Sequence, residues 1–188
     1  SAVDALIGAR LLMDGPRVDA PALAIARAIL RTNPRMTAVG ALELAVATVR
    51  DARKAGLAPE FFAATILQES AYDPHALSSA GAIGIAQFML GTADDADVDP
   101  FDPFDALAGA SRLLGSYVRA YAGVFPDPDA IALAAYNAGP GAVARYHGVP
   151  PYRETREYVS IIYERWGRID GYERNPAEFP PLWWKRGV

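Results

Sequence analysis

Helical periodicity runs through most of the chain and is the feature that most limits its fold. Apolar residues recur at intervals of three and four positions, which places them on one face of an α-helix. Proline opens several of these segments and glycine follows several, as helix starts and stops require. We therefore expect a mainly α protein whose apolar stripes form the core. The predicted helices span residues 21–32, 41–55, 59–69, 104–122, 129–138 and 154–169.

Composition excludes several classes of protein. The 188 residues, 52% of them hydrophobic, suit one compact domain that needs no crosslinks. Cysteine is absent, so neither a disulfide nor a thiolate metal site is possible. A formal net charge of −4 gives no indication of nucleic-acid binding, and no apolar run reaches the length of a membrane span. Because the chain begins at Ser1 rather than Met, we expect processing or trimming, and no targeting segment is visible.

Between residues 70 and 103 the helical pattern gives way to a stretch rich in glycine and serine. Gly81, Gly84 and Gly91 alternate there with short apolar inserts, which is typical of turns. Loops with several glycines also let the backbone approach a ligand closely. We expect a short hairpin or irregular loop that lines a groove.

Glu69 ends the helix predicted at residues 59–69 and shares one face with Phe62 and Ile66. A carboxyl group on an apolar stripe loses water around its charged form, so its pKa should rise. A raised pKa suits a general acid that must stay protonated near neutral pH. From this residue alone, the alternative is a structural carboxylate at a helix end or in a buried ion pair.

Glu69 begins the first of three motifs that follow one another along the chain. Residues 69–93 read ESAYDPHALSSAGAIGIAQFMLGTA, residues 134–141 read AAYNAGPG, and residues 150–159 read PPYRETREYV. Together they resemble the catalytic signature of the lytic transglycosylase domain of soluble murein transglycosylases, glycoside hydrolase family 23. The resemblance runs from Glu60 to Arg168.

The resemblance implies a lysozyme-like helical domain with a small loop or hairpin region and a peptidoglycan groove. On that basis we divide the chain into an N-terminal helical extension at residues 1–58, a catalytic domain at residues 59–170 and a C-terminal arm at residues 171–188. The arm is rich in proline and tryptophan, and we expect its tryptophans to dock on the domain surface.

The implied activity is cleavage of the β-1,4 bond between N-acetylmuramic acid and N-acetylglucosamine, with formation of 1,6-anhydromuramoyl ends. In this chemistry Glu69 is the catalytic acid and then the base, and no cofactor or metal takes part. Asp73 precedes Pro74, which disfavours helical geometry, so we expect Asp73 to serve the turn rather than act as a second carboxylate. The acidic run at residues 94–102 lacks the spacing of a calcium loop.

Five further residues are implied to bind substrate, and the residues themselves leave alternatives open. Ser70 can donate a hydrogen bond to Glu69 or to substrate, or simply end the helix. Gln87 carries donors and an acceptor that suit an N-acetyl group. Tyr136 is implied to lie near the catalytic carboxyl group and Asn137 to hold the loop or the sugar. Tyr158 lies on a core stripe, and only its motif moves it toward the groove.

Two positions depart from the family pattern, which often has Met where this chain has Ala86 and Pro where it has Gly91. Neither change alters the catalytic carboxyl group. The alternative functions are a lysozyme-type hydrolase and a non-catalytic peptidoglycan-binding module. Because the implied partner is a glycan strand of peptidoglycan, we expect action in the periplasm or cell envelope. The sequence does not name a partner in the envelope machinery.

Overall fold

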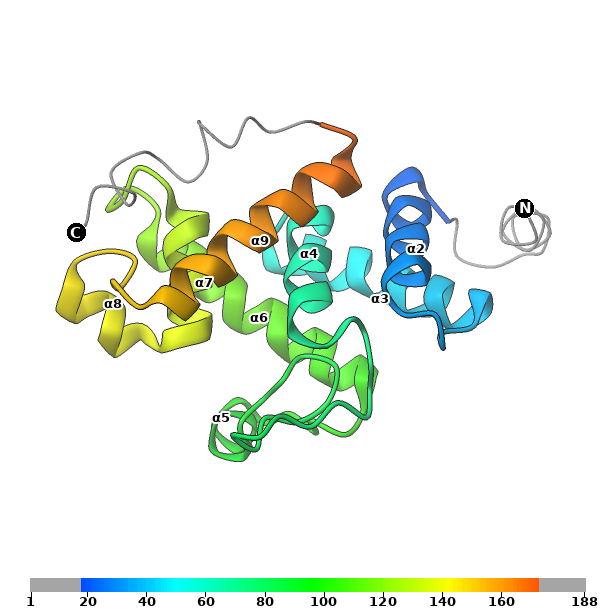
Figure 1. Cartoon of the computed structure of the whole chain (residues 1–188), viewed down its shortest axis with the longest axis horizontal. Coiled ribbons are helices and arrows are strands. Elements are labelled where there is room, and N and C mark those ends of the chain that lie inside the picture. The colour runs from blue at the N-terminus through cyan, green and yellow to red at the C-terminus, as the bar shows by residue number, and fades with distance from the viewer. Residues whose placement is uncertain (1–17, 173–188) are drawn as a thin grey trace.

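The computed structural model describes residues 18–172, and within that range the chain is built from helices without a β-strand (Figure 1). This confirms the mainly α prediction. Residues 1–17 and 173–188 lie outside the described range. The prediction that the C-terminal arm docks on the domain surface falls on these residues. The helices are α2 (Ala20–Thr32), α3 (Ala38–Ala55), α4 (Pro59–Ser70), α5 (Leu90–Ala96), α6 (Pro103–Tyr121), α7 (Pro128–Ala138), α8 (Pro140–Tyr146) and α9 (Arg153–Asp170).

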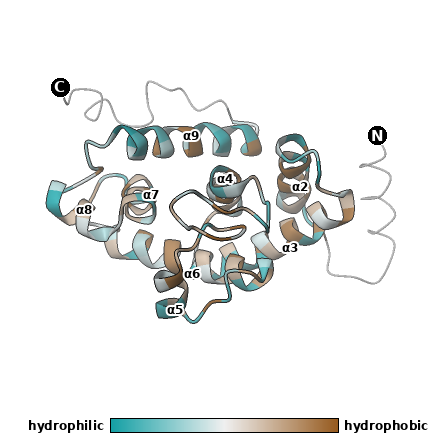
Figure 2. Cartoon of the chain, turned by 60° about the horizontal axis from the view of Figure 1, so that its bottom comes forward, coloured by the Kyte–Doolittle hydropathy of each residue, from teal (hydrophilic) through white to brown (hydrophobic). Residues whose placement is uncertain are grey.

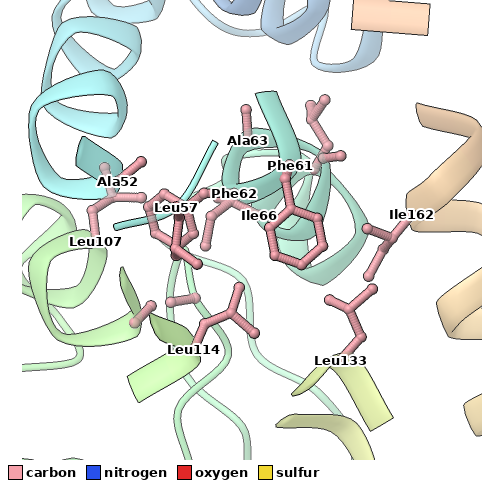
Figure 3. Packing of buried hydrophobic residues seen from close by; sticks show 14 of the residues in the cluster. Ala52, Leu57, Phe61, Phe62, Ala63, Ile66, Leu107, Leu114, Leu133 and Ile162 are labelled. Carbon is pink, nitrogen blue, oxygen red and sulfur yellow. The ribbon is translucent and has the colours of Figure 1, made fainter. Parts of the chain in front are cut away.

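Helix α4 is the centre of the fold. It packs against α2, α3 and α9, and Figure 2 places it between α2, α7 and α9. Phe61, Phe62 and Ile66 of this helix are fully buried. Figure 3 shows them among side chains from α6, α7 and α9, and the ring of Phe61 lies 5.0 Å from that of Trp166. Burying each such side chain contributes about 1.5–3 kcal/mol, so the packing of α4 fixes the position of whatever follows it.

Helices α2 and α3 belong to the same core as the rest of the domain. Their buried residues form one cluster with those of α4, α6, α7 and α9. Helix α3 also approaches α6 closely, because a Cβ added at Gly115 would lie 2.6 Å from the carbonyl oxygen of Ala55. The segment predicted as an N-terminal extension therefore shares its packing with the helix that carries Glu69.

The glycine-rich stretch forms a compact loop rather than a regular hairpin. Two isolated antiparallel bridges join Leu77 to Ile83 and Ile83 to Phe88. Gly84 has a φ of +71°, and a Cβ there would lie 2.2 Å from the carbonyl oxygen of Pro100. The loop therefore packs tightly against the segment that leads into α6.

Two short helices, α5 and α8, were not predicted. Each has seven residues, which is too few to show an apolar stripe, and neither has a side-chain cap at its start. Helix α3 also begins earlier than predicted, at Ala38, because the Thr37 side chain accepts a hydrogen bond from Gly40 N and caps it. Among residues 18–172, no helix combines the length and apolarity that a membrane crossing needs.

Candidate active site

Glu69 lies in the last turn of α4, next to the point where the apolar helix leaves the core. The helix ends at Ser70, and Ala71 turns into the left-handed region with a φ of 54°. The side chain of Glu69 is partly exposed, whereas Phe62 and Ile66 below it are fully buried. The carboxyl group is therefore reachable from solvent while it rests on an apolar base.

Tyr158 of α9 contacts this carboxyl group directly. Its phenol donates a short hydrogen bond to Oε1 of Glu69. The Tyr158 ring is 7% exposed, so the hydroxyl group is presented from a packed position rather than from a mobile side chain. Tyr158 is thus a core residue and a site residue at once. Its ring packs in the core, and its hydroxyl group contacts Glu69.

Burial raises the pKa of Glu69 to about 7, and the hydrogen bond from Tyr158 acts in the opposite direction. Burial also raises the pKa values of Tyr136 and Tyr158 well above their usual value, and the charge of Glu69 adds to both shifts. The two phenols consequently stay protonated while Glu69 exchanges its proton near neutral pH. One group in the site can act as both acid and base at that pH.

Ser70 and Tyr136 hold the loop that follows α4. Ser70 Oγ donates a hydrogen bond of 2.6 Å to the carbonyl oxygen of Ile85, and the Tyr136 hydroxyl group donates one of 3.0 Å to that of Ala86. Both loop residues are fully buried. These two hydroxyl groups therefore fix the loop between α4 and α7, and the hydrogen of Ser70 is engaged by Ile85 O.

Gln87 lies in the same loop with a φ of 53°. Its Nε2 donates to the carbonyl oxygens of Gly84 at 2.9 Å and Ala76 at 3.3 Å. Both amide hydrogens thus close the loop, and the amide oxygen is the atom that remains for a ligand.

Asn137 lies in the last turn of α7, and the Oδ1 of its exposed side chain accepts a hydrogen bond of 2.8 Å from Thr155 Oγ1. Thr155 is buried and lies one turn before Tyr158 on α9. Sequence reasoning did not assign Thr155 a role, although it stands inside the third motif. With its oxygen engaged, Asn137 has its Nδ2 hydrogens as the amide donors that remain for a ligand.

Both oxygens of the Asp73 carboxyl group accept hydrogen bonds from other residues. Its Oδ1 accepts from His75 N at 2.9 Å and its Oδ2 from Arg35 Nη2 at 3.1 Å, so it serves the turn as predicted. Asp102, in the acidic run, caps α6 through Phe104 N and Asp105 N. Within residues 18–172 no group of three or more His, Asp or Glu side chains is arranged to hold a metal ion.

Comparison with known proteins places this geometry in a family. The model of the Transglycosylase SLT domain matches residues 48–159, which include Glu69 and all three motifs. The chain belongs to this family. The match begins inside α3, so α2 and the start of α3 precede the matched segment of the SLT domain.

Curated relatives of the SLT domain are longer proteins. The chain is 32% identical over 138 residues to membrane-bound lytic murein transglycosylase F 2 of Alkalilimnicola ehrlichii, covering 64% of this chain and 30% of that protein. It is 30% identical over 114 residues to membrane-bound lytic murein transglycosylase F of Shewanella halifaxensis, covering 55% and 24%. The chain thus spans less than a third of the length of either relative.

A solved structure shares the fold. The lytic transglycosylase Slt of Pseudomonas aeruginosa, solved as an inactive mutant, superposes with a TM-score of 0.56 at 22% identity and covers 84% of this chain and 32% of that one. The likeness extends over more of the chain than the family match does, and it confirms the predicted fold class.

Proposed function

We propose that this SLT domain is a lytic transglycosylase that cleaves the β-1,4 bond between N-acetylmuramic acid and N-acetylglucosamine and leaves 1,6-anhydromuramoyl ends. One observation carries the proposal. Glu69, which lies within the segment that matches the family, is a carboxyl group with a pKa raised to about 7 and held by the phenol of Tyr158. The names of the curated relatives support the same activity.

In the proposed reaction Glu69 begins protonated and gives its proton to the glycosidic oxygen as the bond from that oxygen to C1 of the muramic acid breaks. The resulting carboxylate takes the proton of the C6 hydroxyl group of the same sugar, whose oxygen bonds to C1. The proton count balances without water, and Glu69 returns to its starting state. A pKa near 7 suits both halves of this cycle, because neither form of the group is strongly disfavoured.

The engagement of Asp73 supports a mechanism with a single carboxyl group. Retaining and inverting glycosidases use two, roughly 5–10 Å apart, and the second acts as nucleophile or activates water. Here the nearest acidic residue in sequence has both oxygens bound to His75 and Arg35. An internal hydroxyl group of the substrate replaces the second carboxyl group in the proposed chemistry.

We propose that substrate contacts come from the groups that the loop and α7 leave unused. Asn137 offers Nδ2 to a carbonyl oxygen such as that of an N-acetyl group, and Gln87 offers its amide oxygen. Ser70 and Tyr136 act on substrate through the loop that they hold, and Tyr158 through Glu69. Because peptidoglycan lies outside the cytoplasm, the proposed site of action is the periplasm or cell envelope.

Mass spectrometry of the products from purified peptidoglycan tests the proposal. The wild type should release anhydromuramoyl ends, Glu69→Gln should release none, and Glu60→Gln, which alters a carboxyl group in the first turn of the same helix, should match the wild type. Reducing ends would make the protein a hydrolase. Binding of glycan without products from the wild type would make it a binding module.

A further inference from the structure

The turn that follows Glu69 is held in an unfavourable backbone conformation. Ala71 and Tyr72 have φ values of 54° and 61°, so two consecutive residues other than glycine occupy the left-handed region. Such residues cost about 1–3 kcal/mol each and persist only where neighbouring groups fix them. This turn follows Glu69 within three residues, so the contacts that fix it act close to the carboxyl group.

Those contacts come from α3 and from the residue that caps the end of α2. Asn33 Nδ2 donates to the carbonyl oxygen of Ala71 at 3.2 Å. The hydroxyl group of Tyr72, which is fully buried, lies 2.9 Å from that of Thr48. Since Thr48 Oγ1 already donates to Leu44 O at 2.8 Å, the phenol of Tyr72 is the donor in this pair.

Asn33 links the end of α2 to the end of α4 by hydrogen bonds. Its backbone N–H closes α2 on Ile29 O at 2.7 Å, and its Oδ1 accepts from Arg35 N at 3.2 Å. With Nδ2 on Ala71 O, both ends of the amide are used, and the residue is 8% exposed. A buried amide with each polar atom paired fixes the two helix ends relative to one another.

We propose that Asn33 and the Thr48–Tyr72 pair are positioning elements for Glu69. They hold the left-handed turn at Ala71 and Tyr72, and through it they keep the carboxyl group of Glu69 on its apolar base and against Tyr158. Asn33 precedes the segment that matches the family, residues 48–159, so the working unit of the enzyme begins earlier than that segment. The expected effect on kcat rests on the proposed function, whereas the expected effect on the position of Glu69 does not.

Substitutions that add no charge can separate an effect on the position of Glu69 from an effect on the stability of the whole domain. Asn33→Leu removes the amide at similar volume, and Tyr72→Phe removes the donor to Thr48 while Thr48 keeps its bond to Leu44 O. Thr32→Val is the matched control, because it removes the neighbouring hydrogen bond to Ala28 O within α2 and leaves α4 untouched. None of these changes adds charge or alters Tyr136 and Tyr158, the groups of α7 and α9 whose pKa values respond to Glu69.

The experiment is a ¹³C NMR titration of the Glu69 carboxyl group in the full chain, with kcat and KM on glycan measured below the melting temperature of each variant. Asn33→Leu and Tyr72→Phe should lower the titration midpoint, because a displaced carboxyl group regains water. They should also lower kcat about tenfold or more with little change in KM, as misplaced catalytic groups do. Thr32→Val should change neither quantity.

Folded variants that keep the wild-type midpoint and kcat, with only a lower melting temperature, would overturn the proposal. If Asn33→Leu does not fold, Tyr72→Phe decides alone. If the wild type shows no turnover on glycan, the proposed function fails, yet the titration still decides whether these residues position Glu69.

Discussion

The phenol of Tyr158 donates a hydrogen bond to Oε1 of Glu69, although the two residues lie 89 positions apart in the chain. The bond joins the last turn of α4 to the second turn of α9, two helices that pack against each other along their length. It favours the charged carboxylate, while burial favours the neutral acid. The balance of these two effects sets the proton affinity of the site.

Tyr158→Phe should raise the pKa of Glu69 above about 7, because the variant loses the contact that lowers it and keeps the burial. In the pH profile of kcat the alkaline limb, where the acid form of Glu69 is lost, should move to higher pH. The rate itself should fall by about tenfold, since the carboxyl group loses its fixed orientation. An unmoved alkaline limb would show that the hydrogen bond does not govern the titration of Glu69.

Glu69→Gln should change how stability depends on pH. The folded pKa of Glu69, about 7, lies above the unfolded value near 4.5, so the folded protein holds this proton more tightly. The stabilising effect is fully present below about pH 4.5 and is lost as pH rises to about 7. Relative to wild type, the variant should gain on the order of 3 kcal/mol across this window. Urea unfolding of both proteins at pH 4.5 and pH 8 measures their free energies of unfolding. A difference between variant and wild type that is the same at both pH values would contradict the assigned pKa.

Tyr136→Phe should reduce both stability and rate. It leaves the buried carbonyl oxygen of Ala86 without its hydrogen bond, which costs about 1–3 kcal/mol. The rate should fall because the loop that follows α4 loses one of the two hydroxyl groups that bind it. Thermal unfolding and glycan turnover measure the two effects, with Tyr121→Phe as a control that keeps its ring contacts with Tyr117 and Phe125. A stable variant with reduced rate would instead make Tyr136 a direct ligand of substrate.

Gly84→Ala should destabilise the protein by about 3 kcal/mol or more, because a new Cβ meets a backbone oxygen of Pro100 at a positive φ. Gly91→Ala is the matched substitution, since nothing lies within 4 Å of its Cβ position and it stands in α5. That change should be neutral or stabilise by up to about 1 kcal/mol. Chemical denaturation of both variants tests the pair, and similar losses would refute the close contact at Gly84.

The sequence predicts the long helices of this fold because each carries an apolar stripe that packing then buries. Leu107, Ala110 and Leu114 of α6 are all fully buried, as their spacing indicates. Helices α5 and α8 escape prediction because seven residues are too few for a stripe to form. Their boundaries depend on tertiary contacts that no local pattern records.

The raised pKa of Glu69 was predictable in direction because Phe62 and Ile66 share its helix face. The partners of Ser70 and Tyr136 were not predictable, because each is fixed by a contact across the fold. Ser70 bonds a loop carbonyl 15 residues away, and Tyr136 bonds one 50 residues away. A motif identifies such residues as a set, but only the three-dimensional structure shows that two of them hold a loop.

Helix α4 passes through the middle of the core, and this burial affects how the protein loses activity on heating. Many enzymes carry their chemistry on loops that open well before the domain unfolds. Here the acid extends from a helix packed against α2, α3 and α9, among the segments that should open last. Loss of activity on heating should consequently coincide with global melting, without an earlier inactivated state in which the domain is still folded.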